Sequence, residues 1–358
     1  ENINTIHELQ ESLEEAELTF SSYAEFLEDI GGGDFPVLTG PFERINQGCY
    51  SIDSLFKQKM RQAERRLVKA DVLMGIACHI CGDFMKETGE MERLWKVVHF
   101  NEFHDTMGGT TIKSARDEAV MQISGVCARA GEIAALAIQH VVNTQDTRGE
   151  GFPLFIFHTG GMPYEDYVEV ELEWFCQSPL KLLDPEGGEI PYQRIHTDAK
   201  IRHTTLGGRR RFVFYASIPA CGFAQYRVVK EEPSLESTPR MEILNPDALR
   251  LENAYLLAEF DKETGMLSSL IKKETGYHAL TEAASLRLYL DERDAWGHLQ
   301  DGRYEDLGVD FHLDSIEKVE SGKLREVIHV RLSYEDTRLE QLYYLGEKER
   351  ELRVENRL

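Results

Sequence analysis

Apolar residues recur at helical spacing over three stretches in the first half of the chain. Across 52–84 they fall three or four positions apart for more than thirty residues, a period typical of one amphipathic helix. A shorter helix is predicted over 90–103, and a second long stripe covers 112–142. Long helices with one apolar stripe each bury it against one another, so the pattern predicts a long three-helix-type bundle.

Helix ends are also predicted from residue type. Residues 5–29 are rich in Glu, Leu, Ala and Phe and contain no Gly or Pro, which predicts one further helix that ends at Gly31. Thr110 or Thr111 is the predicted cap of the helix over 112–142, because a hydroxyl can accept a hydrogen bond from the first turn.

The hydrophobic pattern changes after residue 149. Short runs rich in β-branched and aromatic residues, separated by Gly, Pro and Asp, predict strands at 154–158, 168–175, 211–217 and 224–229. A second set follows, at 255–260, 266–272, 311–319, 327–333 and 341–345, with a turn at 261–265. Helices followed by strands, without alternation, predict a multidomain α + β chain in which the bundle precedes antiparallel β-sandwich domains.

The charge balance narrows the possible partners. The 358 residues include 40 Lys and Arg against 63 Asp and Glu, a net charge of −23, and the densest basic cluster is Arg209 to Arg211. Nucleic acid and anionic membranes need a larger basic footprint, so neither is an expected partner. The longest near-apolar run, 152–157, is far shorter than the roughly 20 residues that span a bilayer. Six cysteines are too few for a disulfide scaffold, which favours a cytoplasmic protein.

Polar and aromatic side chains that could bind a ligand or take part in catalysis are densest between two predicted helices, over 99–110. There His104 offers a nitrogen to a divalent metal, and Asp105 offers a carboxylate to a hydroxyl or to the ligand shell. A helix end with a polar turn is the alternative interpretation. His99 and Glu102 could share a helical face, but His-x-x-Glu-x-His matches no zinc-protease template.

Other candidates have weaker patterns. Cys78 and Cys81 resemble half a thiolate zinc site, but no second pair exists, and Cys81 lies on the apolar stripe, so both are predicted to be core residues. Two His-x-Asp triplets could bind a metal, although exposed strands often contain such triplets: His196 with Asp198, and His312 with Asp314. Three tryptophans could stack on a sugar ring, although a single tryptophan is more often a core residue: Trp95, Trp174 and Trp296. No Gly-rich phosphate loop or Gly-x-Ser-x-Gly elbow occurs.

The string Phe103-His104-Asp105, followed by Gly109-Thr110, resembles the Phe-His-Asp-x-x-x-Gly-Thr signature of the glycoside hydrolase family 38 α-mannosidases. Upstream, 48–51 with Lys57 and Glu64 is similar to the segment that opens the family's first long helix, except that Ile52-Asp53 replace Ser-Arg. Downstream landmarks of the family's β domains have counterparts at 152–157, 218–223, 251–253 and 261–265.

The resemblance implies retaining, zinc-dependent hydrolysis of α-mannosides or oligosaccharides. His104 matches one zinc ligand of the family, and Asp105 matches the neighbour that binds a mannose hydroxyl. The nucleophile, the general acid and the other ligands belong to the family's N-terminal domain, so no catalytic residue is expected in this chain. By itself it is expected to be inactive. A homo-oligomer is compatible with the resemblance.

The resemblance also implies domain boundaries. We expect the tail of an α/β catalytic domain at 1–40, the middle helical bundle at 41–147, a small β-sandwich at 148–236 and the incomplete start of a larger one at 237–358. The chain would then be the middle and C-terminal portion of a longer enzyme. The rival hypothesis is a non-catalytic carbohydrate-binding or assembly module built from the β-sandwiches.

Overall fold

The computed structural model describes residues 2–14, 17–33, 35–37, 39, 48–82, 88–172, 180–195, 210–230, 248–290 and 305–358. Two compact units are distinguished, Glu1–Arg44 and Ile45–Leu358. The domain boundaries expected from the sequence stay predictions.

The first unit contains two short helices, α1 (Asn2–Ser12) and α2 (Tyr23–Ile30), so the prediction of one helix over 5–29 is wrong. The reason is a capping box at the start of α2. The Ser22 hydroxyl accepts a hydrogen bond from the Glu25 amide, and the Glu25 carboxylate accepts one from the Ser22 amide at 2.7 Å. This reciprocal pair favours a new helix start over continuation of α1.

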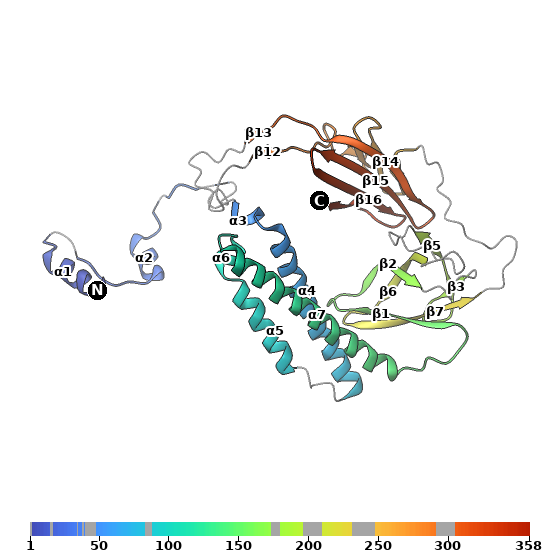
Figure 1. Cartoon of the computed structure of the whole chain (residues 1–358), viewed down its shortest axis with the longest axis horizontal. Helices are drawn as coiled ribbons and strands as arrows, with labels where there is room; N and C mark the ends of the chain where they lie inside the picture. The colour runs from blue at the N-terminus through green and yellow to red at the C-terminus, as the bar shows by residue number, and fades with distance from the viewer. Residues whose placement is uncertain are drawn as a thin grey trace. The chain divides into compact units, whose positions relative to one another are not determined.

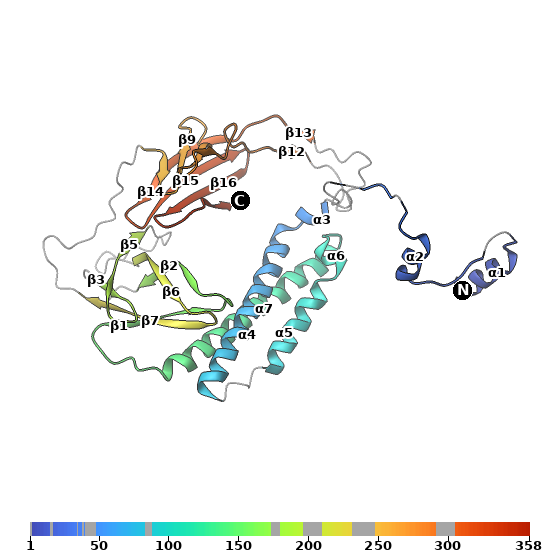
Figure 2. The ribbon, with the colours of Figure 1, turned by 180° about the vertical axis from the view of Figure 1, so that it is seen from behind.

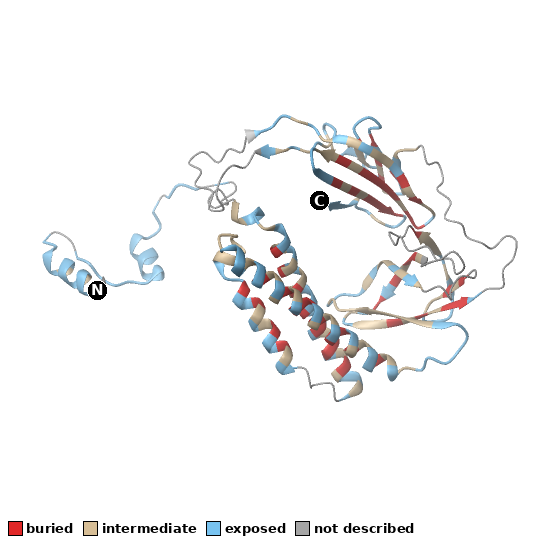
Figure 3. Ribbon diagram, in the orientation of Figure 1, coloured by how far each residue is buried: buried red, intermediate tan, exposed pale blue. Residues whose placement is uncertain are grey.

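The bundle begins the second unit and confirms the predicted three-helix-type arrangement. Its long helices are α4 (Ser54–Cys81), α5 (Thr88–Asn101) and α7 (Lys113–Asn143), which lie side by side in both views of Figures 1 and 2. Two short helices, α3 (Gly48–Ser51) and α6 (His104–Met107), precede α4 and α7. The apolar stripes form one core, visible as the buried bands in Figure 3. Met60, Leu67 and Ile133 are fully buried in it.

Helix α7 is long and apolar enough, by length and composition, to cross a membrane. Nine of its side chains, from Ala119 to Val141, are nevertheless buried in the bundle core. A core helix of a bundle has this composition for the same reason that a membrane helix does, because its apolar face avoids water. The predicted hydroxyl cap of α7 is wrong, since its N-cap is Ile112, which makes no side-chain capping bond.

The first β region is a small sandwich of two antiparallel sheets, as the sequence predicts. One sheet has the order β1-β7-β3-β4 and the other β2-β6-β5. The strands are β1 (Phe152–His158), β2 (Tyr164–Leu172), β3 (Leu180–Leu183), β4 (Glu189–Ile190), β5 (Tyr192–Ile195), β6 (Arg210–Ile218) and β7 (Gly222–Lys230). Phe214 of β6 and Tyr226 of β7 meet edge to face in the core, with ring centres 5.1 Å apart. Phe157 and Phe223 pack against the bundle core.

The described part of the C-terminal β region contains two four-stranded antiparallel sheets, in the orders β11-β10-β9-β8 and β14-β15-β16-β17, and the two-stranded sheet β12-β13. Its strands are β8 (Arg250–Glu252), β9 (Leu256–Phe260), β10 (Leu267–Lys272), β11 (Tyr277–His278), β12 (Tyr289–Leu290), β13 (Glu305–Asp306), β14 (His312–Ser321), β15 (Arg325–Tyr334), β16 (Thr337–Gly346) and β17 (Arg353–Arg357). The two four-stranded sheets share one core, in which the rings of Phe260 and Tyr343 meet edge to face with their centres 4.8 Å apart.

The turn predicted at 261–265 joins β9 to β10. The Asp261 carboxylate accepts hydrogen bonds from the amides of Glu263 and Thr264, at 2.9 and 2.8 Å. Gly265 follows with φ 73°, in the left-handed region that favours glycine. Local side-chain chemistry therefore forms this hairpin, and sequence alone could predict it.

Candidate functional site

His104 and Asp105 open α6, the single turn between α5 and α7. Phe103 is the N-cap of α6, and its carbonyl accepts a hydrogen bond from the Met107 amide at 2.9 Å. The His104 side chain is 70% exposed, and its Nε2 lies 3.5 Å from Asp105 Oδ1. The exposed imidazole is therefore accessible to an external ligand.

Asp105 holds the loop that follows α6. Its main-chain carbonyl accepts hydrogen bonds from the amides of Thr110 and Thr111, at 3.0 and 3.2 Å. The Thr110 hydroxyl donates to Asp105 Oδ1 at 3.2 Å. The side chain is half-exposed, and Oδ2 has no hydrogen-bond partner among the described residues. This oxygen can accept a hydrogen bond from a hydroxyl group outside the chain.

Two glycines follow α6, and the second allows the close approach of this loop to Ile52, just before α4. A Cβ on Gly108 would lie 2.7 Å from the His104 carbonyl oxygen, and a Cβ on Gly109 would clash with Ile52. Gly109 also has φ 75°, which L side chains rarely adopt. The Gly-Thr pair of the sequence string therefore has a structural role in positioning α6.

Charged residues at the start of α4 support the same loop, and sequence reasoning missed their pairing. The Lys57 ammonium donates to the carbonyls of Ile52 and Met107, both at 2.6 Å. Asp53 accepts two hydrogen bonds from the Arg116 guanidinium, at 2.7 and 2.8 Å. Asp53 also caps α4 from a left-handed conformation, with φ 51°.

These contacts shift the pKa values of the charged groups that make them. The hydrogen bond from Arg116 is the largest cause that holds the pKa of Asp53 below its usual value. Burial lowers the pKa of Lys57, and the nearby Asp53 charge opposes that shift. An Asp before an apolar stripe could have been recognised as an N-cap, but no local signal pairs Asp53 with a residue 63 positions away.

The neighbouring candidates His99 and Glu102 form a separate pair. His99 Nδ1 lies 2.7 Å from Glu102 Oε2, and the imidazole stacks on Trp95 with ring centres 5.6 Å apart. Asn101 between them is buried and donates to the Val97 carbonyl and to Gln122 of α7. These contacts anchor the end of α5. Neither His99 nor Glu102 joins His104 and Asp105 in a group of three side chains that could hold a metal ion.

The remaining sequence candidates are placed as follows. Cys78, Cys81 and Trp95 pack against the bundle core, which confirms their core interpretation. Asp314 accepts a hydrogen bond from the Ser333 hydroxyl, and His312 is exposed on β14. Outside the described residues lie His196, Asp198, Trp174, Trp296 and Arg209.

The donor set around His104 fits part of a zinc site. Zinc sites use three or four protein ligands, and imidazole nitrogen is one of the preferred donors. Within the described ranges, no three His, Cys, Asp or Glu side chains come together to hold a metal ion. His104 can therefore supply one ligand, and a complete shell needs donors from outside the described residues.

Comparison with known proteins decides the family. The family model described as "Alpha mannosidase middle domain" matches residues 45–141, and the model described as "Glycosyl hydrolases family 38 C-terminal domain" matches 251–358. The chain belongs to glycosyl hydrolase family 38. Within this family 38 chain, His104 and Asp105 lie inside the stretch that matches the middle domain.

Relatives and solved structures agree with that assignment. Human alpha-mannosidase 2C1 is 22% identical over 244 residues, and the mouse protein of the same name is 23% identical over 246. Each alignment covers 68% of this chain and 20% of the relative. Two solved structures share the fold. A family 38 protein from Enterococcus faecalis is 14% identical with a TM-score of 0.66, and an alpha-mannosidase from Enterococcus faecalis V583 is 13% identical with a TM-score of 0.67. Each match covers 99% of this chain and 48% of the solved chain, so this chain spans about half their length.

Proposed function

We propose that this chain is part of a retaining, zinc-dependent α-mannosidase of the cytoplasm, in which His104 is a zinc ligand and Asp105 binds a hydroxyl of the mannoside. The main support is the exposed imidazole of His104 beside a half-exposed carboxylate, on a helical turn that Lys57 of α4 holds through the Met107 carbonyl. The family assignment supports a glycoside hydrolase.

In this proposal the chain contributes orientation and binding. The bond from Lys57 to the Met107 carbonyl and the bonds from Thr110 and Thr111 to Asp105 hold α6 rigid. A rigid turn fixes the position from which the imidazole side chain extends, and this limits the places where it can bind a metal. Asp105 Oδ2 accepts a hydrogen bond from the sugar. A bound zinc ion would supply Lewis-acid polarisation of sugar oxygens.

Retaining hydrolysis also needs two carboxyl groups about 5–5.5 Å apart on opposite sides of the scissile bond. We assign neither the nucleophile nor the general acid to this chain. The 358-residue chain alone is therefore expected to be inactive on an aryl α-mannoside.

The test uses a full-length enzyme that contains this chain and compares His104→Ala with His99→Ala. Both variants remove an exposed imidazole from the same segment, but only His104 is the proposed ligand. We expect His104→Ala to lower bound zinc and kcat/KM together, by roughly a hundredfold or more in activity, while His99→Ala leaves both near wild type.

Two results would contradict the proposal. Unchanged zinc content in His104→Ala would remove this residue from the metal site. Zinc-dependent hydrolysis by the 358-residue chain would show that the chain holds a complete active site. The rival hypothesis of a non-catalytic binding module predicts that His104→Ala has no effect on either quantity.

A further inference from the structure

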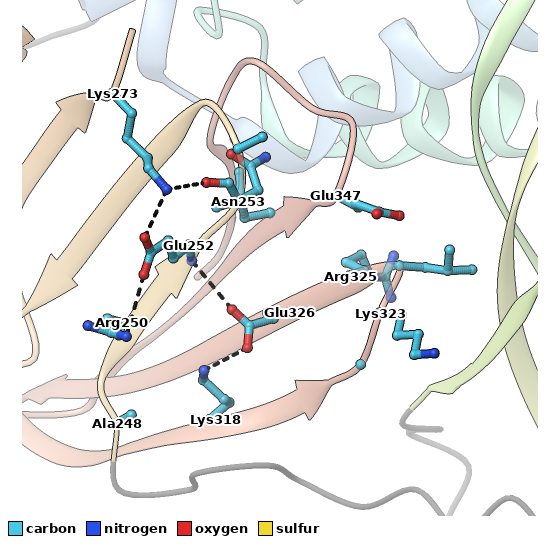
Figure 4. A pocket seen from close by; sticks show the side chains of 14 residues that line it. Ala248, Arg250, Glu252, Asn253, Lys273, Lys318, Lys323, Arg325, Glu326 and Glu347 are labelled. Carbon is cyan, nitrogen blue, oxygen red and sulfur yellow. Dashed lines mark hydrogen bonds and ion pairs between the residues drawn. The ribbon is translucent and has the colours of Figure 1, made fainter. Parts of the chain in front are cut away.

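A hollow of about 790 Å³ opens in the C-terminal β domain, away from α6 in the sequence. Its walls come from β8 with the loop behind it, the end of β10, the hairpin between β14 and β15, and the end of β16. Figure 4 shows charged side chains around the space. The volume lies in the range of roughly 300–1,000 Å³ that is usual for ligand pockets.

One wall of the hollow is a connected network of paired charges. Lys273 donates to Glu252 Oε1 at 2.9 Å and to the Asn253 carbonyl at 2.8 Å. Lys318, whose side chain is only 4% exposed, donates to Glu326 Oε1 at 2.9 Å. Glu326 Oε2 accepts a hydrogen bond from the Glu252 amide at 3.4 Å, which links the two pairs. The network holds these side chains in place without a ligand.

The opposite wall carries charges that the described residues do not satisfy. Lys323 and the Glu347 side chain have no hydrogen bond or ion pair in the described part of the chain, and Figure 4 shows them across the hollow from Glu252. Asn253 uses its amide group to bind the carbonyls of Gly346 and Glu349, both at 2.7 Å. Two charged side chains without a partner among the described residues therefore lie across the hollow from the paired wall.

The charge balance distinguishes between ligand classes. Five basic and three acidic side chains line the hollow, but Arg325 is already paired with Glu320 and Glu169, at 2.7 and 2.6 Å. The other lining residues carry four positive and three negative charges. A site for a phosphate would need a larger positive excess. The nearly balanced charges of the lining instead offer a ligand both hydrogen-bond donors and hydrogen-bond acceptors.

A neutral polyol suits such a lining. Each sugar hydroxyl can donate one hydrogen bond and accept others. Carboxylates such as Glu252 accept from hydroxyls, and ammonium groups such as Lys323 donate to them. Adjacent hydroxyls on one ring can therefore bind a Lys and a Glu at the same time.

We propose that this hollow is a second, non-catalytic saccharide-binding site, separate from the His104 site. Its expected ligand is a neutral oligosaccharide that contacts Glu252, Lys273 and Lys323. The choice of a mannoside as the saccharide rests on the proposed function. The hollow and its lining residues are observed independently of that function.

The test is calorimetric titration of the 358-residue chain with α-1,2-mannobiose, with maltose and inorganic phosphate as competitors. We expect saturable binding of mannobiose, weakened about tenfold by Glu252→Gln, which replaces a charged acceptor with a neutral one, and by Lys323→Ala, which removes a charged donor. Lys262→Ala, an exposed lysine in the β9–β10 turn, is the matched control and should bind as wild type. Lys323 is exposed on a hairpin, so its variant is expected to fold normally.

Several results would overturn the inference: no saturable mannobiose binding, binding equal in both variants and wild type, or displacement of mannobiose by phosphate. Binding lost in His104→Ala but kept in Glu252→Gln would place the saccharide at α6, and would overturn the second site while leaving the proposed function intact. Conversely, unchanged zinc in the His104→Ala enzyme, with binding at the hollow retained, would overturn only the proposed function.

Discussion

The turn that carries His104 and the hollow in the C-terminal β domain expose polar groups in opposite ways. His104 is 70% exposed and lies against one carboxylate, whereas Lys318 in the hollow is 4% exposed and fully paired. An exposed imidazole contributes little to stability and is available to a ligand. A buried ion pair is needed by the fold, because either partner alone is costly to bury. The comparison separates an exposed side chain that is available to a ligand, His104, from a buried pair that the fold needs, Lys318 with Glu326.

The largest expected effect on stability is at Glu326. The change Glu326→Ala leaves the buried Lys318 ammonium without its carboxylate, and we expect a loss of roughly 3 kcal/mol in the free energy of unfolding. Urea unfolding measures it. Glu317→Ala on β14 removes an exposed pair with Arg331 and is the control, with an expected loss below about 0.5 kcal/mol. Equal losses in the two variants would contradict the distinction between buried and exposed pairs.

Gly109→Ala should destabilise the other region by roughly 2–3 kcal/mol. The new Cβ would clash with Ile52, and the backbone has φ 75°. Gly125 of α7 is the control, because a Cβ there meets no atom within 4 Å and alanine favours the helix. We expect Gly125→Ala to stabilise by about 0.5–1 kcal/mol in thermal unfolding. A neutral Gly109→Ala would show that α6 is not held against the start of α4.

Asp53→Asn should cost about 1–3 kcal/mol at neutral pH, since it weakens two charge-assisted hydrogen bonds from Arg116. The folded protein lowers the pKa of Asp53, so its stabilisation is complete above the unfolded value near 4 and is lost as the pH falls through the lower folded value. The melting temperatures of variant and wild type should therefore converge in acid. A difference that persists well below pH 4 would contradict this assignment.

The smallest expected effect is at His104. His104→Ala should change the free energy of unfolding of the 358-residue chain by less than about 0.5 kcal/mol, because the side chain is mainly exposed. Chemical denaturation without added zinc measures this. A loss above 1 kcal/mol would mean that the imidazole has a structural role, and would remove the contrast with Lys318.

Much of the fold could be predicted from local patterns. The helical spacing of apolar residues over 52–84 and 112–142 continues for so many turns that single exceptions do not obscure it. The two predicted helices match α4 and α7 within a few residues. The 5–29 prediction failed because Ser22 and Glu25 form a capping box that begins a new helix. The cap prediction for α7 failed because the helix begins at Lys113, which places Ile112, and neither threonine, in the N-cap position.

The candidate site could be predicted only in part. His104, Asp105 and Gly109 form one sequence string, so their proximity follows from their order in the chain. The support from Lys57 and Arg116 joins segments 50 and 63 residues apart, and such pairs leave no periodic signal. The hollow was missed for the same reason, since its lining comes from strands that meet only in the folded sheets.

The sequence by itself determined the helical bundle, the following β regions and the His104-Asp105 pair, because periodicity and adjacent residues encode local structure directly. The tertiary structure alone decided that Asp53 pairs with Arg116, that His104 is exposed without a third metal ligand among the described residues, and that Glu252 and Glu326 share one network. Those features depend on how distant segments pack, and side-chain contacts across more than fifty residues are set by the global fold.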